Sequence, residues 1–260
     1  MASGHSKRSS KDKIVLMYHD VFNDTCIKTG FNTKGADYYK VSIEQFESQL
    51  DAIACLISEK KILPDDVLLT FDDGGVSAHE IITPVLERYG FKGHFFIVSE
   101  LIGMPGFMSE NQILDLLARG HMIGSHSATH PSRFESLSTE ERKQEWKISL
   151  ERLNSLSSNT IKEISIPNGY FVREDVGFLK DLGVEVIYHS SYGDNYHENR
   201  ICVQGRVAVT SKTSMTDIIK FFTCENYRRL YICKNRCLHF LKRILGDNYL
   251  IIKKLIRNYI

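Results

Sequence analysis

The chain has 260 residues and a mass of 29.8 kDa, and its 42% hydrophobic and 25% charged residues are typical of a soluble globular protein, which excludes whole-chain disorder. No apolar run approaches the about 18 residues that a membrane-spanning helix needs. The formal net charge is +1, but residues 226–260 carry nine Lys or Arg and one acid, Asp247. We therefore expect the basic end and the mildly acidic remainder to have different roles.

The N-terminus and the cysteines suggest the compartment. Residues 1–13 are polar and basic and lack the apolar stretch of a signal peptide, so we expect residues 1–12 to be a disordered or cloning-derived segment. The six cysteines are too few and too far apart to cross-link a chain of this length: Cys26, Cys55, Cys202, Cys224, Cys233 and Cys237. Without an export signal, a cytoplasmic protein with reduced thiols is expected.

Strand-like apolar runs alternate with amphipathic helical stretches. The expected strands are residues 13–19, 67–71, 92–98, 121–125, 164–166, 184–189 and 207–210. The expected helices are residues 42–60, with Ser42 as N-cap, 76–89, 110–118, 139–156 and 174–182. This alternation predicts an α/β fold of βαβ units with a parallel sheet, and six or seven units over roughly 210 residues favour an incomplete (β/α) barrel over an open sheet. Either architecture collects reactive residues at the carboxyl ends of the strands.

One candidate motif is TFDDGG at residues 70–75, where an apolar strand ends in two adjacent carboxylates and two glycines let the chain turn into the next helix. Two carboxylates side by side repel each other, so the pair Asp72-Asp73 indicates a bound cation or a shared proton. An Asp-Asp pair alone is weak evidence, because Asp65-Asp66 is a second one. The alternative is a solvated turn.

A second candidate motif is HSATH, in which His126 and His130 stand four residues apart after an expected strand. On a helical turn this spacing points both imidazoles the same way, as a shared metal ion requires. An accidental pair among ten histidines is the alternative. Because both motifs follow strands, we expect them on the same face of the barrel, where a carboxylate and two imidazoles would leave a coordination position for water and the other carboxylate would act as a base.

These motifs resemble the two signatures of the polysaccharide deacetylases, the NodB-homology group within carbohydrate esterase family 4. The resemblance extends over about residues 13–210 and includes MYHDV at 17–21, GHFFIV at 93–98, GFMS at 106–109, GHMIGSHSATHP at 120–131 and SIPNGYF at 165–171. It implies a distorted (β/α) barrel of about seven strands, here residues 13–224 with a helical extension at 225–260. It also implies a metal-dependent hydrolase that removes an N-acetyl group from an amino-sugar polysaccharide or its lipid-linked precursor.

The resemblance also implies roles for individual residues. Asp72 would be the base on a metal-bound water, and the metal ligands would be Asp73, His126 and His130. Zn²⁺ is the default ion for two imidazoles and a carboxylate, with Co²⁺, Ni²⁺ or Mn²⁺ as alternatives. The resemblance places the oxyanion donor and the substrate-binding residues in one loop, Pro167, Asn168, Gly169 and Tyr170.

The sequence departs from better-known members at two places. They carry an Arg-x-Pro-Tyr segment and a late Leu-x-His, whereas residues 165–168 have no Arg and residues 203–206 have no His. Arg206 is a candidate to orient Asp72, although an arginine cannot serve as an acid near neutral pH. His189 and His19, each at the end of an expected strand, are the candidate proton donors, and a packing histidine is the alternative for each.

Two other functions remain open. The missing Arg and His are compatible with a saccharide-binding barrel without turnover, and the same site would also suit a deacylase for formyl or O-acetyl groups. A base beside a metal favours the enzyme.

The basic end, residues 225–260, reads as two amphipathic helices separated at 246–248. It either packs on the barrel or lies as a peripheral element on the anionic inner face of a membrane, which would suit a lipid-linked substrate. No nucleic-acid-reading module is recognisable.

Overall fold

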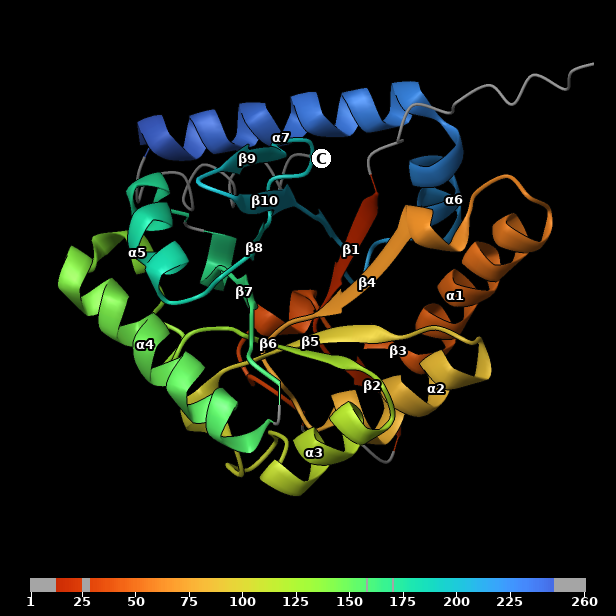
Figure 1. Ribbon diagram of the computed structural model, residues 1–260. Helices are drawn as coiled ribbons and strands as arrows, with labels where there is room; N and C mark the ends of the chain where they lie inside the picture. Colours follow the sequence, from red (N-terminus) through yellow and green to blue (C-terminus); the bar gives the residue numbers. More distant parts are fainter. Residues whose placement is uncertain (1–12, 25–28, 158, 170, 246–260) are drawn as a thin grey trace, which may run out of the picture.

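The structure is a computed structural model that describes residues 13–24, 29–157, 159–169 and 171–245, with side chains up to Cys237. The expected N-terminal segment 1–12, Cys26 and the second helix of the basic end therefore lie outside the described residues. The centre is a nine-stranded sheet in the order β11-β1-β4-β5-β6-β7-β8-β10-β9 (Figure 1). Its strands are β1 (Ile14–Tyr18), β4 (Val67–Phe71), β5 (Gly93–Ile97), β6 (Met122–Ser125), β7 (Glu163–Ser165), β8 (Val186–His189), β9 (Tyr196–Glu198), β10 (Ile201–Gly205) and β11 (Val207–Ala208).

A single residue closes this sheet into a barrel. β10 pairs in parallel with β8, and β11 pairs in parallel with β1, at the other side of the sheet. Only Arg206 separates β10 from β11, so the segment 201–208 bridges the last strand to the first. If β10 and β11 are counted as one strand, the described part of the chain forms a barrel of seven parallel strands. β9 pairs with β10 as an additional antiparallel strand. The expected distorted (β/α)7-type barrel is confirmed.

Helices α1 to α5 cover the outside of the sheet (Figure 1). They are α1 (Ile43–Ser58), α2 (Thr83–Arg88), α3 (Glu110–Ala118), α4 (Thr139–Leu156) and α5 (Val176–Asp181). Ser42 caps α1 by accepting a hydrogen bond from the N–H of Gln45, as expected. The helix expected at 76–89 instead begins with a π-helical turn, Ala78–Ile82, because Pro84 has no N–H for a regular helical bond.

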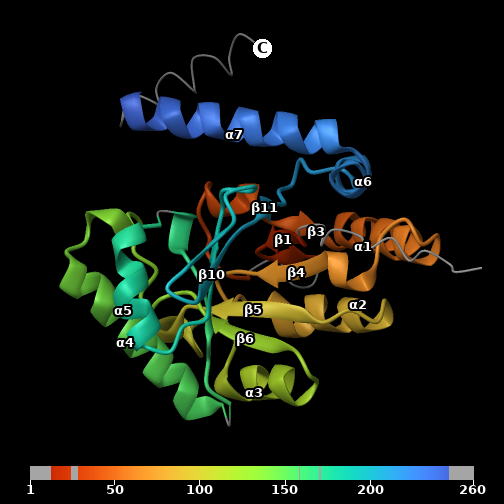
Figure 2. The same ribbon diagram turned by 45° about the horizontal axis from the view of Figure 1, so that its top comes forward.

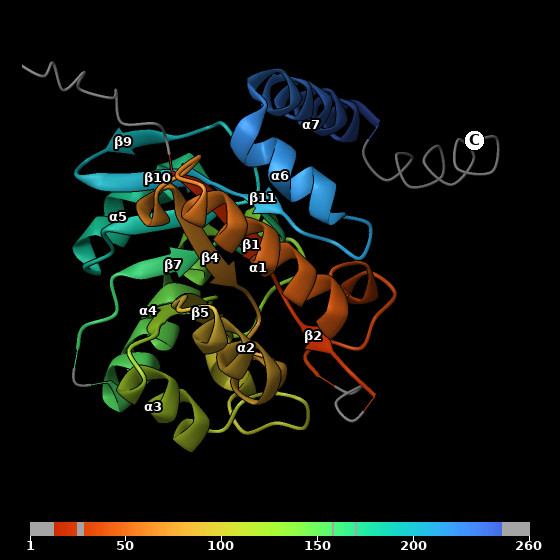
Figure 3. The ribbon, with the colours of Figure 1, turned by 90° about the vertical axis from the view of Figure 1, so that its right-hand side faces the viewer.

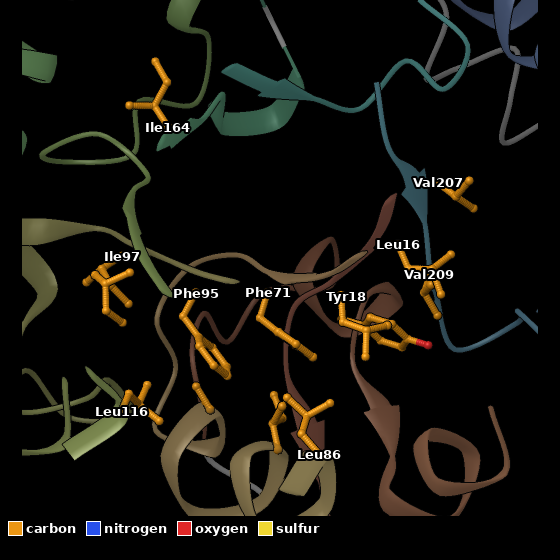
Figure 4. Close-up of a cluster of buried hydrophobic side chains, with 14 of the residues drawn as sticks. Leu16, Tyr18, Phe71, Leu86, Phe95, Ile97, Leu116, Ile164, Val207 and Val209 are labelled. Atoms are coloured by element: carbon orange, nitrogen blue, oxygen red, sulfur yellow. The ribbon is translucent and has the colours of Figure 1, made fainter. Parts of the chain in front are cut away.

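The period of two along the strands separates two groups of side chains. Tyr18, Phe71 and Phe95 point outward and stack in a row above α2, with ring centroids 5.5 and 4.9 Å apart (Figure 4). Phe96 and Tyr188 belong to strands that are not neighbours, yet their rings lie 5.2 Å apart, so they meet across the barrel interior. Residues that alternate with the outer core therefore line the interior.

The chain ends with α6 (Met215–Thr223) and α7 (Glu225–Leu245). α6 was not predicted from the sequence; it packs on α1, and α7 packs on α6 (Figure 3). Cys55, Cys202, Cys224, Cys233 and Cys237 are free thiols. Within the described residues, no helix combines the length and the apolar composition that crossing a bilayer requires.

Candidate active site

The side chains expected to do chemistry lie at the carboxyl ends of parallel strands. Asp72 and Asp73 follow β4, His126 follows β6, Ser165 ends β7 and Arg206 follows β10. Because alternate residues of a strand point to the same side, Asp72, His126, Ser165 and Arg206 continue the inward-facing rows, whereas Asp73 comes after a change in backbone direction at its positive φ. The closed barrel thus brings residues from four distant parts of the chain into contact at one end.

Asp73, His126 and His130 form a group whose ligand atoms all lie within 4.8 Å of one another. Oδ1 of Asp73 is 3.4 Å from Nε2 of His126 and 3.6 Å from Nε2 of His130, and it is buried without a hydrogen-bond partner. The Nδ1–H of His126 donates to the carbonyl of Ser165 at 2.8 Å, which leaves its Nε2 lone pair for the cluster. An orphaned carboxylate oxygen beside two imidazoles fits a divalent metal ion.

The local backbone of the histidine motif differs from the expected helical turn. Residues 126–130 are irregular, and both Ser127 (φ +66°) and His130 (φ +58°) adopt left-handed conformations. Asp73 is left-handed as well, with φ +76°. Such conformations are costly for residues other than glycine and cluster at functional sites. The two imidazoles therefore converge through a strained loop, and the prediction of a helical turn was wrong.

The ionisation of this group suits metal ligation. Burial raises the pKa of Asp73, but the close contact with His126 and the surrounding imidazole charges outweigh it and lower that pKa. Burial, with the nearby charge of His126, lowers the pKa of His130 to about 4. For His126, burial opposes the charged form, yet Asp72 and Asp73 raise its pKa. Near neutral pH, Asp73 is therefore ionised and His130 is neutral, the forms that bind metal ions.

Asp72 is held separately from the metal-binding group. Arg206, which is fully buried, donates from Nη1 to Oδ1 of Asp72 at 2.7 Å and from Nη2 to Oδ2 at 2.6 Å. Ser165 Oγ donates to the same Oδ2 at 3.0 Å, and Thr70 Oγ1 accepts from Nη1 of Arg206 at 3.1 Å. Burial alone would raise the pKa of Asp72, but the charge of Arg206, followed by that of His126, holds it well below its ordinary value. The result is an ionised carboxylate in a fixed orientation.

These residues open into a cavity of about 490 Å³. His19 lines this cavity beside Asp72 and Asp73; its ring packs 4.7 Å from that of Tyr39, and its Nδ1 is buried without a hydrogen-bond partner. Phe31 lies 4.9 Å from the ring of His130 on the same wall. The aromatic residues Phe31 and Tyr39 were not predicted from the sequence, because they lie outside regular elements and belong to no motif.

The loop expected to bind substrate forms another wall of the cavity. Asn168 and Gly169 line it, and both have positive φ. The Asn168 side chain donates to the carbonyls of Pro131 and Ser132 at 3.4 Å, which ties this loop to the histidine loop. Pro167 is buried and does not line the cavity, and Tyr170 lies outside the described residues. The Gly169 N–H donates to the Ile166 carbonyl, so it is not directed at the cavity as an oxyanion donor.

His189, the other candidate proton donor, is not among the residues that line the cavity. Its Nδ1 accepts from the N–H of Ser191 at 3.2 Å, and its Nε2–H donates to the carbonyl of Asp194 at 3.0 Å. These two bonds fix a neutral tautomer. The geometry gives His189 the role of supporting the segment 190–194.

A larger hollow of about 660 Å³ lies at the opposite end of the barrel. It is lined by Met122, Glu163 and Val186, the first residues of β6, β7 and β8. In barrels of this type the amino ends of the strands carry stability and the carboxyl ends carry function. The smaller cavity is therefore the candidate active site.

Comparisons with known proteins show which family the chain resembles. Residues 60–187 match the family model described as polysaccharide deacetylase. YxkH of Bacillus subtilis, which carries the same family name, is 24% identical over 174 residues, or 66% of this chain and 62% of that protein, less than two thirds of its length.

Solved structures share the fold. IcaB from Ammonifex degensii gives a TM-score of 0.65 at 20% identity and covers 82% of this chain and 97% of its own. The Streptococcus pyogenes deacetylase PplD, in complex with acetate, gives 0.62 at 18% and covers 81% and 97%. At these identities the likeness shows the fold alone.

Proposed function

We propose that the chain is a member of the polysaccharide deacetylase family and acts as a metal-dependent hydrolase that removes the N-acetyl group from an amino-sugar polysaccharide or its lipid-linked precursor. The observation that carries the proposal is the placement of an oriented, ionised Asp72 beside the Asp73, His126 and His130 group in one cavity. A protein that only binds saccharide has no need of a rigidly held second carboxylate there.

Asp73, His126 and His130 would hold the metal ion, most consistent with Zn²⁺ for one carboxylate and two imidazoles. Such an ion supplies a water of lowered pKa and polarises the acetamide carbonyl. Asp72 accepts a proton from the water while the oxygen of the water bonds to the carbonyl carbon. Its low pKa makes Asp72 a weak base, so its contribution depends on position and on an acidified water.

Arg206 provides that position. Its two hydrogen bonds to Asp72 prevent the carboxylate from rotating, and Ser165 holds Oδ2 from a third direction. Oδ2 accepts two of these hydrogen bonds, whereas Oδ1 accepts one and keeps a lone pair for a water in the cavity. Arg206 is a positioning residue, because its side chain is buried behind Asp72 and does not line the cavity.

His19 is the proposed proton donor to the departing nitrogen. When the C–N bond breaks, the amide nitrogen must take a proton, because an amide anion is a very poor leaving group. His19 lies in the cavity beside both aspartates, and an imidazole can donate and recover a proton near neutral pH. The products are acetate and a free amino sugar. Phe31 and Tyr39 offer apolar ring faces against which a sugar can pack.

Acetate release from N-acetylated chito-oligosaccharides, measured with added Zn²⁺ or Co²⁺, tests the proposal. Asp72→Asn should retain bound metal but lose at least about a hundredfold in kcat. Asp73→Asn should lose metal as well, as measured by metal content after dialysis. Asp65→Asn, an exposed position in the chain's other Asp-Asp pair, is the matched control and should be unchanged in both measurements.

Metal retention without acyl release from any N-acetylated or O-acetylated saccharide would instead indicate a binding barrel. Equal turnover by wild type and Asp72→Asn would remove Asp72 from the mechanism.

A further inference from the structure

Helix α7 lies along the surface of the barrel and is bound to it by one face. Tyr227 and Tyr231 pack against the hydrophobic core, and the Tyr231 ring contacts Phe221 of α6 with centroids 4.8 Å apart. The Tyr227 hydroxyl donates to Asp217 at 2.8 Å. The ribbon shows α7 above the barrel and not embedded in it (Figure 2). The inner face of α7 thus packs on the barrel, which is one of the two arrangements expected for this basic segment.

The outer face of α7 is apolar along its centre. Leu230 is 70% exposed, and Cys233 and Cys237 are also exposed at the following positions of the same face. The sequence continues this three-and-four spacing with Phe240 and Ile244. An exposed leucine within a continuous apolar stripe is unusual for a helix that faces only water.

Basic residues border the apolar stripe. Arg229 and Arg236 stand seven residues apart on one side, and the sequence continues this row with Arg243. Lys234 is exposed on the other side. Arg229 pairs with Glu225, and Arg236 pairs with Asp194, but exposed pairs of this kind bind weakly and leave the cations available.

We propose that the outer face of α7 docks on a bilayer of anionic phospholipid. Its apolar stripe would enter the acyl boundary while the flanking cations contact lipid phosphates, which is the pattern of an interfacial amphipathic helix. The sequence beyond the described residues has the same chemistry, since residues 249–260 are all Tyr, Leu, Ile, Lys, Arg or Asn.

A second copy of the chain is the main competing occupant of the stripe. In a helix pair through Leu230, Cys233 and Cys237, cations would border the seam on both sides of each helix. Flanking positions of one sign repel across such a seam. Within α7 the sequence offers one acid, Glu225, against six Lys or Arg. Charge therefore favours an anionic surface over self-association.

The docking face is connected to the candidate active site. Ile232 of α7 packs so closely on Gly193 that a Cβ there would lie 2.6 Å from it, and Arg236 pairs with Asp194 at 2.8 Å. The same segment contributes Ser190 to the cavity wall. A membrane-docked α7 would therefore hold the cavity beside the bilayer surface, where a lipid-linked saccharide is presented; this consequence rests on the proposed deacetylase function.

Sedimentation of the full chain with vesicles tests the docking without any turnover. We expect binding to phosphatidylcholine vesicles containing about 30% phosphatidylglycerol, little binding to pure phosphatidylcholine, and release on raising NaCl from about 50 to about 500 mM. The double variant Arg229→Gln/Lys234→Gln should weaken binding by about tenfold or more. Leu230→Asp should weaken it comparably by opposing insertion of the stripe.

The matched control removes two cations elsewhere. Lys147→Gln/Lys180→Gln alters exposed positions on α4 and α5 and should change binding by less than about twofold. The proposal would be overturned if the chain bound both vesicle types equally, or if the control variant lost as much vesicle binding as the α7 variants. A dimer in solution that Leu230→Asp dissociates, or binding to soluble heparin without binding to vesicles, would also overturn it.

An activity measurement separates the docking from the chemistry. Docking predicts that the α7 variants slow acetate release from a vesicle-borne N-acetylglucosaminyl lipid but leave release from a soluble chito-oligosaccharide unchanged. Vesicle binding without turnover of either substrate would refute the proposed function and retain the docking. Turnover without vesicle binding would do the reverse.

Discussion

Arg206 binds both carboxylate oxygens of Asp72, at 2.7 and 2.6 Å, from the one position that joins β10 to β11. The residue that closes the barrel is therefore also the residue that orients the proposed base. Any shift in the closure of the barrel moves the guanidinium, and the carboxylate moves with it. This relationship links the stability of the fold to the geometry of the site.

Arg206→Lys should lower both stability and activity. Lysine cannot form the two parallel hydrogen bonds, and a poorly paired buried carboxylate costs about 3–5 kcal/mol in the free energy of unfolding. Because even a displacement of about 1 Å can cost about a hundredfold in rate, kcat should fall at least that far. Urea unfolding and steady-state kinetics measure the two effects.

Arg142→Lys is the matched control. Arg142 makes the same kind of buried, two-bond pair with Asp175, at 2.7 and 2.8 Å, between α4 and the start of α5. Arg142→Lys should lower the free energy of unfolding about as much as Arg206→Lys does, while the folded fraction keeps its kcat. Equal kcat losses in the two variants would show that Arg206 has only a structural role.

Substrates with different leaving groups distinguish the two candidate proton donors, His19 and His189. His19→Gln should lower kcat on an N-acetyl sugar by about 10²–10³-fold. It should retain most activity on p-nitrophenyl acetate, because p-nitrophenolate departs without a proton. His189→Gln breaks the support of segment 190–194 and should affect both substrates alike. A selective loss on the amide in His189→Gln instead would reverse the assignment.

Sequence patterns were sufficient for the parts of the site that follow a strand. Asp72-Asp73 and His126 were predicted together because each comes directly after an apolar run, and parallel strands place their carboxyl ends on one edge. α3 and α4 have the bounds that the sequence predicted, and in the structure Ser109 and Ser138 begin them with capping boxes.

Contacts between residues far apart in the sequence could not be predicted from sequence patterns in the same way. Ser165 and Thr70 hold the Arg206–Asp72 pair across separations of 41 and 136 residues from Arg206, and no sequence pattern assigned either of them this role. β11 has two residues, so its pairing with β1 depends on closure of the whole sheet. The left-handed residues of the histidine loop are Ser127 and His130, and no glycine marks either position in the sequence.

The close approach at the end of β10 predicts a sensitive glycine. A Cβ on Gly205 would lie 2.0 Å from the carbonyl oxygen of Ser191 and 3.1 Å from Cα of Tyr192. Backbone atoms cannot rotate away, so Gly205→Ala should cost about 1–3 kcal/mol in stability. It should also lower kcat/KM, because it displaces Arg206 and the segment that contributes Ser190 to the cavity.

Gly177→Ala provides the contrast. Nothing lies within 4 Å of a Cβ at this position, which is inside α5. Alanine favours the helix over glycine by up to about 1 kcal/mol, so this variant should unfold at higher urea with unchanged kinetics. A Gly205→Ala protein as stable as wild type would show that segment 190–194 yields without cost.

A histidine far from the site should make stability depend on pH. The buried His121 accepts the N–H of Gly93 on Nδ1 at 3.0 Å, which requires an unprotonated nitrogen. Burial, with Lys92 and Arg119, lowers the pKa of His121 against the opposing effect of Glu87. The folded state thus binds fewer protons than the unfolded state below the ordinary histidine pKa of about 6.5, and the free energy of unfolding should fall as the pH drops through that value.

Urea unfolding between about pH 7.5 and about pH 5.5 measures this dependence. His121→Gln removes the titrating group, so its free energy of unfolding should decline less steeply toward acid than that of wild type. His197→Gln, at an exposed position on β9, should keep the wild-type slope. Parallel slopes for wild type and His121→Gln would mean that protonation of this imidazole does not oppose folding, and that the Gly93 contact tolerates the charged ring.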